Sequence, residues 1–145
     1  MGRFLARIHL VGAKRRFEHR PTLSWQALGG DSSKYLLTQG WLPSHLETAY
    51  ESLVRDLLAL IEQRFDEATP YRQQRLHGDC HAGNVLWTDA GPHFVDLDDC
   101  MTGPAVQDLW MLLSGTPDEM GRQLGETLDG YGQFVAIYGA KGLAW

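Results

Sequence analysis

The sequence predicts an α+β fold that is mainly helical and contains one small β-hairpin. Two observations support this prediction. Apolar residues recur at the three- and four-residue spacing of a helix in several segments, and two short apolar runs flank a turn that contains glycine and proline. The chain has 145 residues, with 43% hydrophobic and 21% charged side chains, as in an ordinary globular protein. This length is enough for one domain with its own core and not for two.

The beginning of the chain is expected to contain one short helix followed by a loop. Four apolar residues at helical spacing predict an amphipathic helix: Phe4, Leu5, Ile8 and Val11. Residues 14–40 are polar and are interrupted by Pro21, Gly29, Gly30 and Gly40. Because glycine and proline mark turns, this segment predicts a long loop with little regular structure.

The clearest helix is predicted to begin at Ser44. Ser44 and Glu47 have the spacing of a capping box, in which each side chain satisfies a free backbone N–H group of the other residue. An apolar stripe follows, formed by Leu46, Ala49, Leu53, Val54, Leu57, Leu58, Ile61 and Phe65. The stripe predicts a helix of the hydrophobic core, which Pro70 ends.

A β-hairpin and two further helices are expected in the second half of the chain. Residues 85–87 and 93–95 are strand-like, and the intervening Asp89 and Gly91 supply turn geometry. Pro104 suits the first turn of a helix that runs through residues 109–113. The apolar spacing of Leu124, Leu128, Tyr131 and Phe134 predicts a last helix, and this pattern fades over residues 138–145.

Polar side chains gather at the two ends of the predicted hairpin. His77, Asp79, His81 and Asn84 precede it, and Asp96, Asp98 and Asp99 follow it. Because a hairpin brings its ends together, Asn84 and Asp96 should face one another. Two oxygen-bearing side chains held close together make a site for a hard cation such as Mg²⁺.

The order and spacing of Asp79, Asn84 and Asp96 indicate phosphoryl transfer. This reaction needs a carboxylate that orients the attacking hydroxyl and accepts its proton, and it needs metal ions that bridge the phosphates. In protein kinases the catalytic aspartate precedes a metal-binding asparagine by five residues, and a second metal-binding aspartate follows. Asp79, Asn84 and Asp96 reproduce that arrangement.

The segment from His77 to Asn84 resembles the H-G-D-x-H-x-x-N signature of the aminoglycoside phosphotransferase and choline kinase superfamily. Residues 94–99 are similar to that superfamily's second aspartate segment. Residues 76–87, 94–99 and 103–113 together are closer still to the bacterial stress response kinase A family, and residues 2–9 resemble it more weakly. The resemblance therefore covers most of the chain.

The resemblance implies a protein-kinase-like C-terminal lobe and an ATP-dependent serine/threonine protein kinase. It makes Asp79 the catalytic base and makes Asn84 and Asp96 the magnesium ligands. His81 is expected either to bond near the transferred phosphate of ATP or to brace the loop. Asp98, like Asp99, is expected either to contact a second metal or a nucleotide phosphate, or to cap the following turn. Asp108 matches the helix aspartate that braces the catalytic loop in kinases.

Three other functions compete with the kinase interpretation. The G-D-x-H stretch at residues 78–81 also resembles one block of binuclear metallophosphoesterases, but those enzymes need further histidine blocks and no histidine follows His93. A small-molecule phosphotransferase acting on aminoglycoside-like or choline-like alcohols would use the same catalytic parts. A truncated, non-catalytic remnant is a further alternative, because no glycine-rich loop with kinase spacing precedes Asp79.

Residues 1–145 are accordingly expected to form part of a kinase domain, without its N-terminal ATP-grasping lobe and its final helices. No apolar run reaches the roughly 18 residues of a membrane span, and the first residues lack the pattern of a signal peptide, so a cytoplasmic protein without membrane contact is expected.

The two cysteines, Cys80 and Cys100, are expected to be reduced. The basic triplet at residues 14–16 favours a solvated loop over nucleic-acid binding. The expected partners are ATP and protein substrates, and the full-length protein is expected to be a monomer.

Overall fold

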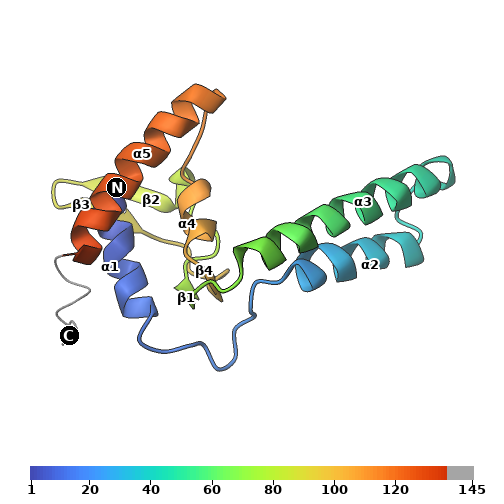
Figure 1. Ribbon diagram of the computed structural model, residues 1–145, viewed down its shortest axis with the longest axis horizontal. Helices are drawn as coiled ribbons and strands as arrows, with labels where there is room; N and C mark the ends of the chain where they lie inside the picture. The colour runs from blue at the N-terminus through green and yellow to red at the C-terminus, as the bar shows by residue number, and fades with distance from the viewer. Residues whose placement is uncertain (137–145) are drawn as a thin grey trace. The chain divides into compact units, whose positions relative to one another are not determined.

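The computed structural model describes residues 1–136, which form two compact units (Figure 1). One unit combines residues 1–22 with the chain from Arg72 onward, and the other is Leu23–Tyr71. Both helices and small antiparallel sheets are present, so the predicted α+β class is confirmed. Residues 138–145, over which the last helical pattern fades, lie outside the described residues.

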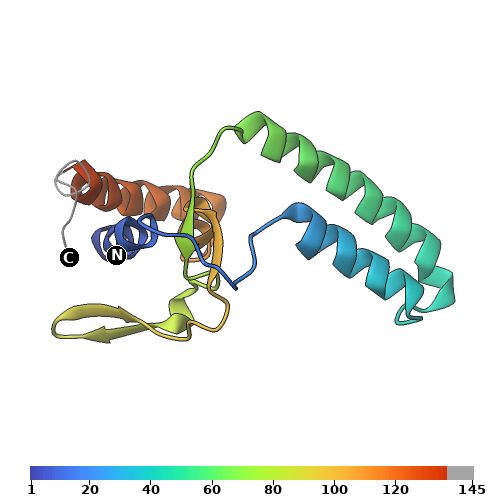
Figure 2. The ribbon, with the colours of Figure 1, turned by 90° about the horizontal axis from the view of Figure 1, so that it is seen from below.

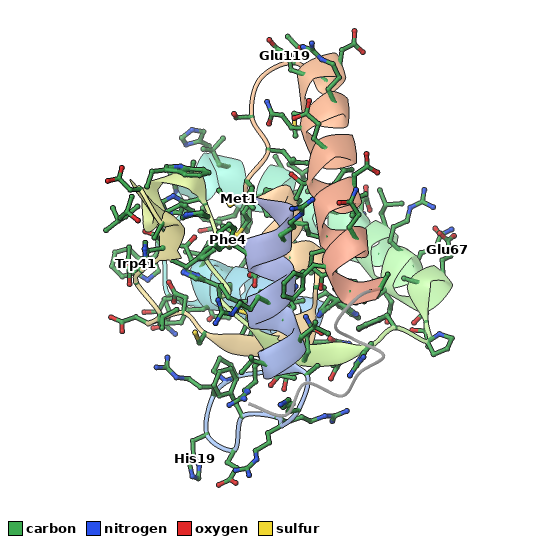
Figure 3. The ribbon with its side chains drawn as sticks, turned by 90° about the vertical axis from the view of Figure 1, so that its left-hand side faces the viewer. Met1, Phe4, His19, Trp41, Glu67 and Glu119 are labelled. Carbon is green, nitrogen blue, oxygen red and sulfur yellow. The ribbon has the colours of Figure 1, made fainter. Side chains whose placement is uncertain are left out.

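Two helices of the first unit lie side by side, α1 (Gly2–Gly12) and α5 (Pro117–Phe134), as Figures 2 and 3 both show. Their close approach depends on Gly2, because a Cβ atom there would collide with the carbonyl oxygen of Thr127. Both helices were predicted, and both are confirmed. The small core of this unit contains the buried Leu5, Cys80 and Leu109, against which Phe94, Leu112 and Tyr131 pack.

The predicted hairpin is confirmed as β2 (Val85–Thr88) and β3 (Gly91–Phe94), which pair antiparallel with Val85 opposite Phe94. A short 3₁₀ turn, η2 (Ala82–Asn84), leads directly into β2. In Figure 2 the hairpin is a ribbon of its own that runs below α1, and a Cβ atom at its Gly91 would lie 2.6 Å from Cζ of Phe4 on α1.

A second two-stranded sheet was not predicted. It pairs β1 (Gln73–Leu76) with β4 (Met101–Pro104), with Leu76 opposite Met101 and Gln73 opposite Pro104. The prediction that Pro104 opens a helix was therefore wrong, since Pro104 ends a strand and α4 (Val106–Trp110) begins after it. Pro104 is tolerated there because a proline at the end of a strand in a two-stranded sheet removes no essential ladder bond.

Helix α5 begins with a capping box that was not predicted from the sequence. The Thr116 side chain accepts a hydrogen bond from the Glu119 amide, and the Glu119 carboxylate accepts one from the Thr116 amide at 2.7 Å. Pro117 occupies the first helical position, where its missing N–H group costs nothing.

The second unit is a helical hairpin made of a π-helical turn, η1 (Gln26–Asp31), with α2 (Ser32–Thr38) and α3 (Ser44–Ala68). The prediction of a long loop over residues 14–40 was therefore wrong for residues 26–38. Gly29 does not break the helical run but allows close packing, because a Cβ atom there would lie 2.6 Å from Cδ2 of Leu58 on α3.

Helix α3 has the predicted bounds, but two predictions about it were wrong. Pro43 occupies the N-cap position and no side chain caps the helix, because the chain is already helical at Ser44. No residue of α3 is buried, and Leu53 is 59% exposed, so α3 is not a core helix. Within its unit it packs against the short α2 and against Gly29 of η1, which together leave most of the apolar stripe exposed.

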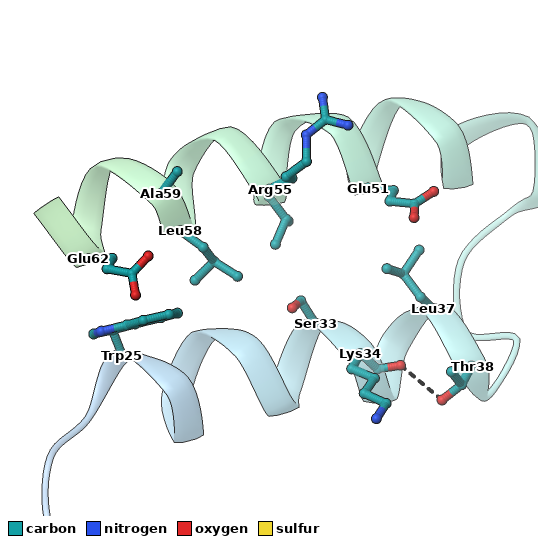
Figure 4. A pocket seen from close by; sticks show the side chains of 11 residues that line it. Trp25, Ser33, Lys34, Leu37, Thr38, Glu51, Arg55, Leu58, Ala59 and Glu62 are labelled. Atoms are coloured by element: carbon teal, nitrogen blue, oxygen red, sulfur yellow. Dashed lines mark hydrogen bonds between the residues drawn. The ribbon is translucent and has the colours of Figure 1, made fainter.

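The side chains of α2 and α3 border an open groove of about 580 Å³ (Figure 4). Trp25, Leu37 and Leu58 supply much of its apolar lining, with Glu51 and Glu62 on α3. None of the residues predicted to carry chemistry lines this groove. In the described part of the chain, no helix has the length and hydropathy that crossing a membrane requires.

Candidate active site

The loop from His77 to Asn84 takes a shape that Gly78 makes possible. Gly78 has a φ of +90°, a backbone conformation that side chains with a Cβ atom rarely adopt. A Cβ atom at this position would also collide with the carbonyl oxygen of Asp99. Gly78 therefore lets the loop turn close to the segment that follows the hairpin.

Asp108, which is completely buried, holds the beginning of this loop. Its Oδ2 accepts a hydrogen bond from the backbone amide of His77 at 2.8 Å, and its Oδ1 accepts one from the amide of Gly78 at 2.9 Å. The neighbouring Gln107 donates from Nε2 to the Gly78 carbonyl oxygen at 3.3 Å. The expectation that Asp108 braces the loop is confirmed.

Asn84 ties the other end of the loop to Asp79. Its side-chain nitrogen donates to the Asp79 carbonyl oxygen at 2.9 Å and to the Asp79 Oδ2 at 3.2 Å. Because both of these oxygens only accept hydrogen bonds, the amide nitrogen of Asn84 must face Asp79. The amide oxygen of Asn84 then remains for another ligand.

His81 bonds within its own loop. Its Nδ1 accepts a hydrogen bond from the Gly83 amide at 3.0 Å, which caps the η2 turn. In the neutral ring Nε2 then carries the proton, and this atom lies 3.4 Å from the Asp79 Oδ2. Both His81 and Asp79 are partly open to solvent, with 48% and 35% of their side chains exposed.

Asp96 leaves the hairpin beside this loop. The Val95 amide donates to the Asn84 carbonyl oxygen at 3.0 Å, and the His77 Nε2 bonds the Val95 carbonyl oxygen at 2.8 Å. Asp96 follows with a φ of +60°, and within residues 1–136 no other residue except glycine has a positive φ. Such strained backbone concentrates at functional sites. The strand register and the bond between Val95 and Asn84 place Val95 opposite Asn84, with Asp96 as the next residue, so the expected pairing of Asn84 with Asp96 stays a prediction.

Asp98 and Asp99 lie on the exposed turn after Asp96. The Arg20 guanidinium donates to the Asp98 carbonyl oxygen, which fastens the basic loop at residues 14–20 to this turn. Asp98 makes this contact through its backbone oxygen, and both Asp98 and Asp99 are exposed. Whether Asp98 binds nucleotide stays a prediction.

The residues present fit a magnesium ion that is completed by phosphates. Among residues 1–136, no three His, Cys, Asp or Glu side chains come together as a closed metal cage. Mg²⁺ keeps several waters and commonly takes only one or two carboxylates in addition to substrate phosphates. The amide oxygen of Asn84 and the exposed carboxylate of Asp96 are oxygen ligands of the required kind.

The polar roles of the buried His9 and the partly buried Tyr131 were not predicted from the sequence. His9 on α1 bonds Asp108 through Nε2, and Tyr131 on α5 bonds His9. A polar residue four positions after Leu5, on the apolar face of the first helix, was the available signal.

Comparison with known proteins places the chain in a family of phosphotransferases. The chain belongs to the phosphotransferase enzyme family, whose family model matches residues 1–143. Stress response kinase A of Escherichia coli (strain K12) is 43% identical to it over 134 residues, which are 92% of this chain and 40% of that protein. A Salmonella typhimurium protein named serine/threonine protein kinase RdoA is 40% identical over 131 residues, or 90% of this chain and 39% of that protein. The resemblance to the stress response kinase A family is confirmed.

Similarity in structure supports the same fold. A solved structure titled amicoumacin kinase hAmiN in complex with AMP-PNP, Ca²⁺ and Ami matches 91% of this chain and 41% of that one, with a TM-score of 0.65 and 17% identity. The kinase-type lobe that was predicted is thereby confirmed as a fold. The chain spans about 40% of the length of the curated relatives it matches.

Proposed function

We propose that the intact protein is an ATP-dependent serine/threonine protein kinase, which transfers the γ-phosphoryl group of ATP to a hydroxyl group of a protein with the help of Mg²⁺. The observation that carries this proposal is the hydrogen bond between the Asn84 amide and the Asp79 Oδ2, at 3.2 Å. It joins the proposed base to the proposed metal ligand, which are five residues apart, as in the catalytic loop of protein kinases. The relatives named as stress response and serine/threonine kinases favour a protein acceptor.

Asp79 is the proposed base because its carboxylate is held and yet reachable. One oxygen, Oδ2, accepts the bond from Asn84, so that Oδ1 can take the proton of an acceptor hydroxyl. The side chain is 35% exposed, which leaves room for that hydroxyl to approach. A fixed base contributes mainly by orienting the attacking group and receiving its proton.

Asn84 and Asp96 are the proposed ligands of Mg²⁺, through the Asn84 amide oxygen and the Asp96 carboxylate. When it is bound, the ion offsets the negative charge that builds on the phosphates during transfer. The bonds from Asn84 to Asp79 fix the direction of the amide oxygen, and the Asp96 backbone is set by its left-handed conformation. The Asn84 amide oxygen is therefore oriented before the ion arrives.

His81 and Asp98 are proposed to contact the nucleotide. The Nε2–H group of His81 lies 3.4 Å from Asp79 on an exposed side chain, where a transferred phosphate oxygen could accept from it. Asp98 is proposed to reach the nucleotide phosphates through a second Mg²⁺ ion. We also propose that the protein acts as a monomer in the cytoplasm and does not bind nucleic acid.

A radiolabel-transfer assay with the intact protein tests the acceptor. The protein is incubated with Mg²⁺, γ-labelled ATP and either protein substrates or small alcohols of the aminoglycoside and choline type. Labelled phosphoserine or phosphothreonine in proteins is the expected result. Labelling of the small alcohols alone would replace the protein-kinase proposal with a small-molecule phosphotransferase, and no transfer to any acceptor would favour a non-catalytic remnant.

A further inference from the structure

A chain of hydrogen bonds runs from the partly buried Tyr131 on α5 through the buried His9 on α1 to the buried Asp108. The Tyr131 hydroxyl lies 2.9 Å from Nδ1 of His9, and Nε2 of His9 lies 2.9 Å from the Asp108 Oδ2. His9 is 1% exposed and Asp108 is completely buried, so water does not compete for the bond between them, whereas the bond to Tyr131 is partly buried. The rings of His9 and Tyr131 also meet edge to face, with centroids 5.6 Å apart.

The direction of these bonds follows from their chemistry. The Asp108 carboxylate only accepts, so Nε2 of His9 must carry a proton and donate it. In the neutral imidazole Nδ1 then accepts, and the Tyr131 hydroxyl donates to it. The pKa of Tyr131 is raised, mainly by burial, and this keeps the hydroxyl protonated.

The same carboxylate oxygen serves both His9 and the catalytic loop. The Asp108 Oδ2 accepts from Nε2 of His9 and from the backbone amide of His77, while Oδ1 accepts from the Gly78 amide. A bond from His9 therefore limits rotation of the carboxylate against which the loop is fixed. Asp79 follows directly after the two amides that this carboxylate holds.

We propose that His9 and Tyr131 are positioning residues, which orient Asp108 and through it the loop that carries Asp79. For its effect on catalysis this inference rests on the proposed function above. The packing of α1 on α5 keeps the two side chains in reach of one another, with Arg3 bonded to Gln133 at 2.9 Å along the same contact. The close approach at Gly2 is part of the same arrangement.

Four variants of the intact protein test the proposal: Tyr131→Phe, His9→Leu, His9→Gln and the control Leu5→Ala. Tyr131→Phe removes only the hydroxyl, His9→Leu removes the whole link, and His9→Gln keeps an N–H donor for Asp108. Leu5 is fully buried on the same helix as His9 but takes no part in the hydrogen-bond chain, so Leu5→Ala reports the effect of a weakened core alone.

Two readouts are compared, the first being steady-state kinetics. His9→Leu should lower kcat about tenfold or more and leave the KM for ATP within about twofold, as expected when alignment and not binding is lost. Tyr131→Phe should show a smaller loss of the same kind, and His9→Gln should recover part of it. A kcat for His9→Leu no lower than that of Leu5→Ala would overturn the proposal.

The second readout is hydrogen exchange at the His77 and Gly78 amides, and it does not depend on activity. In His9→Leu these two amides should exchange about tenfold faster or more than the change in global stability accounts for, and in Leu5→Ala they should not. Unchanged relative protection would overturn the positioning role. If the wild-type protein transferred no phosphate, the proposed function would fail while this exchange measurement still decided the inference.

Discussion

The backbone amide of His77 donates a hydrogen bond to Asp108, whose Oδ2 lies 2.8 Å away and is completely buried. With the Gly78 bond to Oδ1, one carboxylate fixes both amides that precede Asp79. The position of the proposed base thus depends on a residue of another element, α4. A charged group without exposure is stabilised here by the donors that surround it.

Replacing Asp108 should damage the fold as well as the site. In Asp108→Asn a side-chain NH₂ group would face backbone donors, and at least one buried N–H group would lose its acceptor. We expect the free energy of unfolding to fall by about 3 kcal/mol, measured by urea denaturation. Asp129→Asn, on the exposed face of α5, is the control and should change it by less than about 0.5 kcal/mol. Equal effects of the two substitutions would contradict the bracing role.

The parts of the site that were predicted depend on local sequence. The hairpin has strand-like runs and a turn with Asp89 and Gly91, and the spacing of Asp79 and Asn84 is set within one loop. Such features need no knowledge of distant contacts. The spacing alone suggested phosphoryl transfer. The resemblance to a known family then led to the more specific expectation of a serine/threonine protein kinase.

The parts that were missed depend on distant partners. Neither Gln73–Leu76 nor Met101–Pro104 alternates apolar and polar residues, and each becomes a strand by pairing with the other. Gly29 looked like a helix breaker, but its missing side chain makes room for Leu58. The role of His9 depends on two distant partners, Asp108 and Tyr131, which lie 99 and 122 positions further along the chain.

Asp96 should show that backbone strain is kept for function. Its φ of +60° costs a residue with a Cβ atom about 1 kcal/mol, and glycine avoids that cost. In Asp96→Gly we expect the free energy of unfolding to stay equal or rise by up to about 1 kcal/mol, while affinity for Mg-ATP falls. Thermal unfolding and nucleotide titration measure the two effects. A clear loss of stability, or unchanged Mg-ATP affinity, would contradict this account of Asp96.

The capping box of α5 should make stability depend on pH. Hydrogen bonds from the Thr116 backbone and side chain lower the pKa of Glu119 below its ordinary value of 4.5. The stabilising effect is therefore complete above pH 4.5 and is lost as the pH falls through the lowered value.

The substitution Glu119→Gln tests this pH dependence. It should lower the melting temperature at pH 7, and the difference from the wild type should shrink under acid conditions. Glu126→Gln, an exposed change on the same helix, serves as the control. A difference that grew as the pH fell would have the wrong sign for the capping box.

The two cysteines should differ in reactivity. Burial, with smaller contributions from the Asp108 and Asp79 charges, raises the pKa of the fully buried Cys80 to about 12. Cys100 is only partly buried. Iodoacetamide at pH 8 should therefore modify Cys100 at least about tenfold faster than Cys80 in the native protein, as followed by peptide mass spectrometry. In urea the two rates should converge, and preferential native labelling of Cys80 would contradict the burial of this loop.

The most direct test of the central proposal is phosphoryl transfer by the intact protein with Asp79→Ala, beside Asp89→Ala as a control from the exposed hairpin turn. Loss of the base should lower the transfer rate by about a hundredfold or more, with Mg-ATP affinity within about threefold of the wild type. Asp89→Ala should transfer phosphate at the wild-type rate. Near-normal transfer by Asp79→Ala would contradict the assignment of Asp79 as the catalytic base.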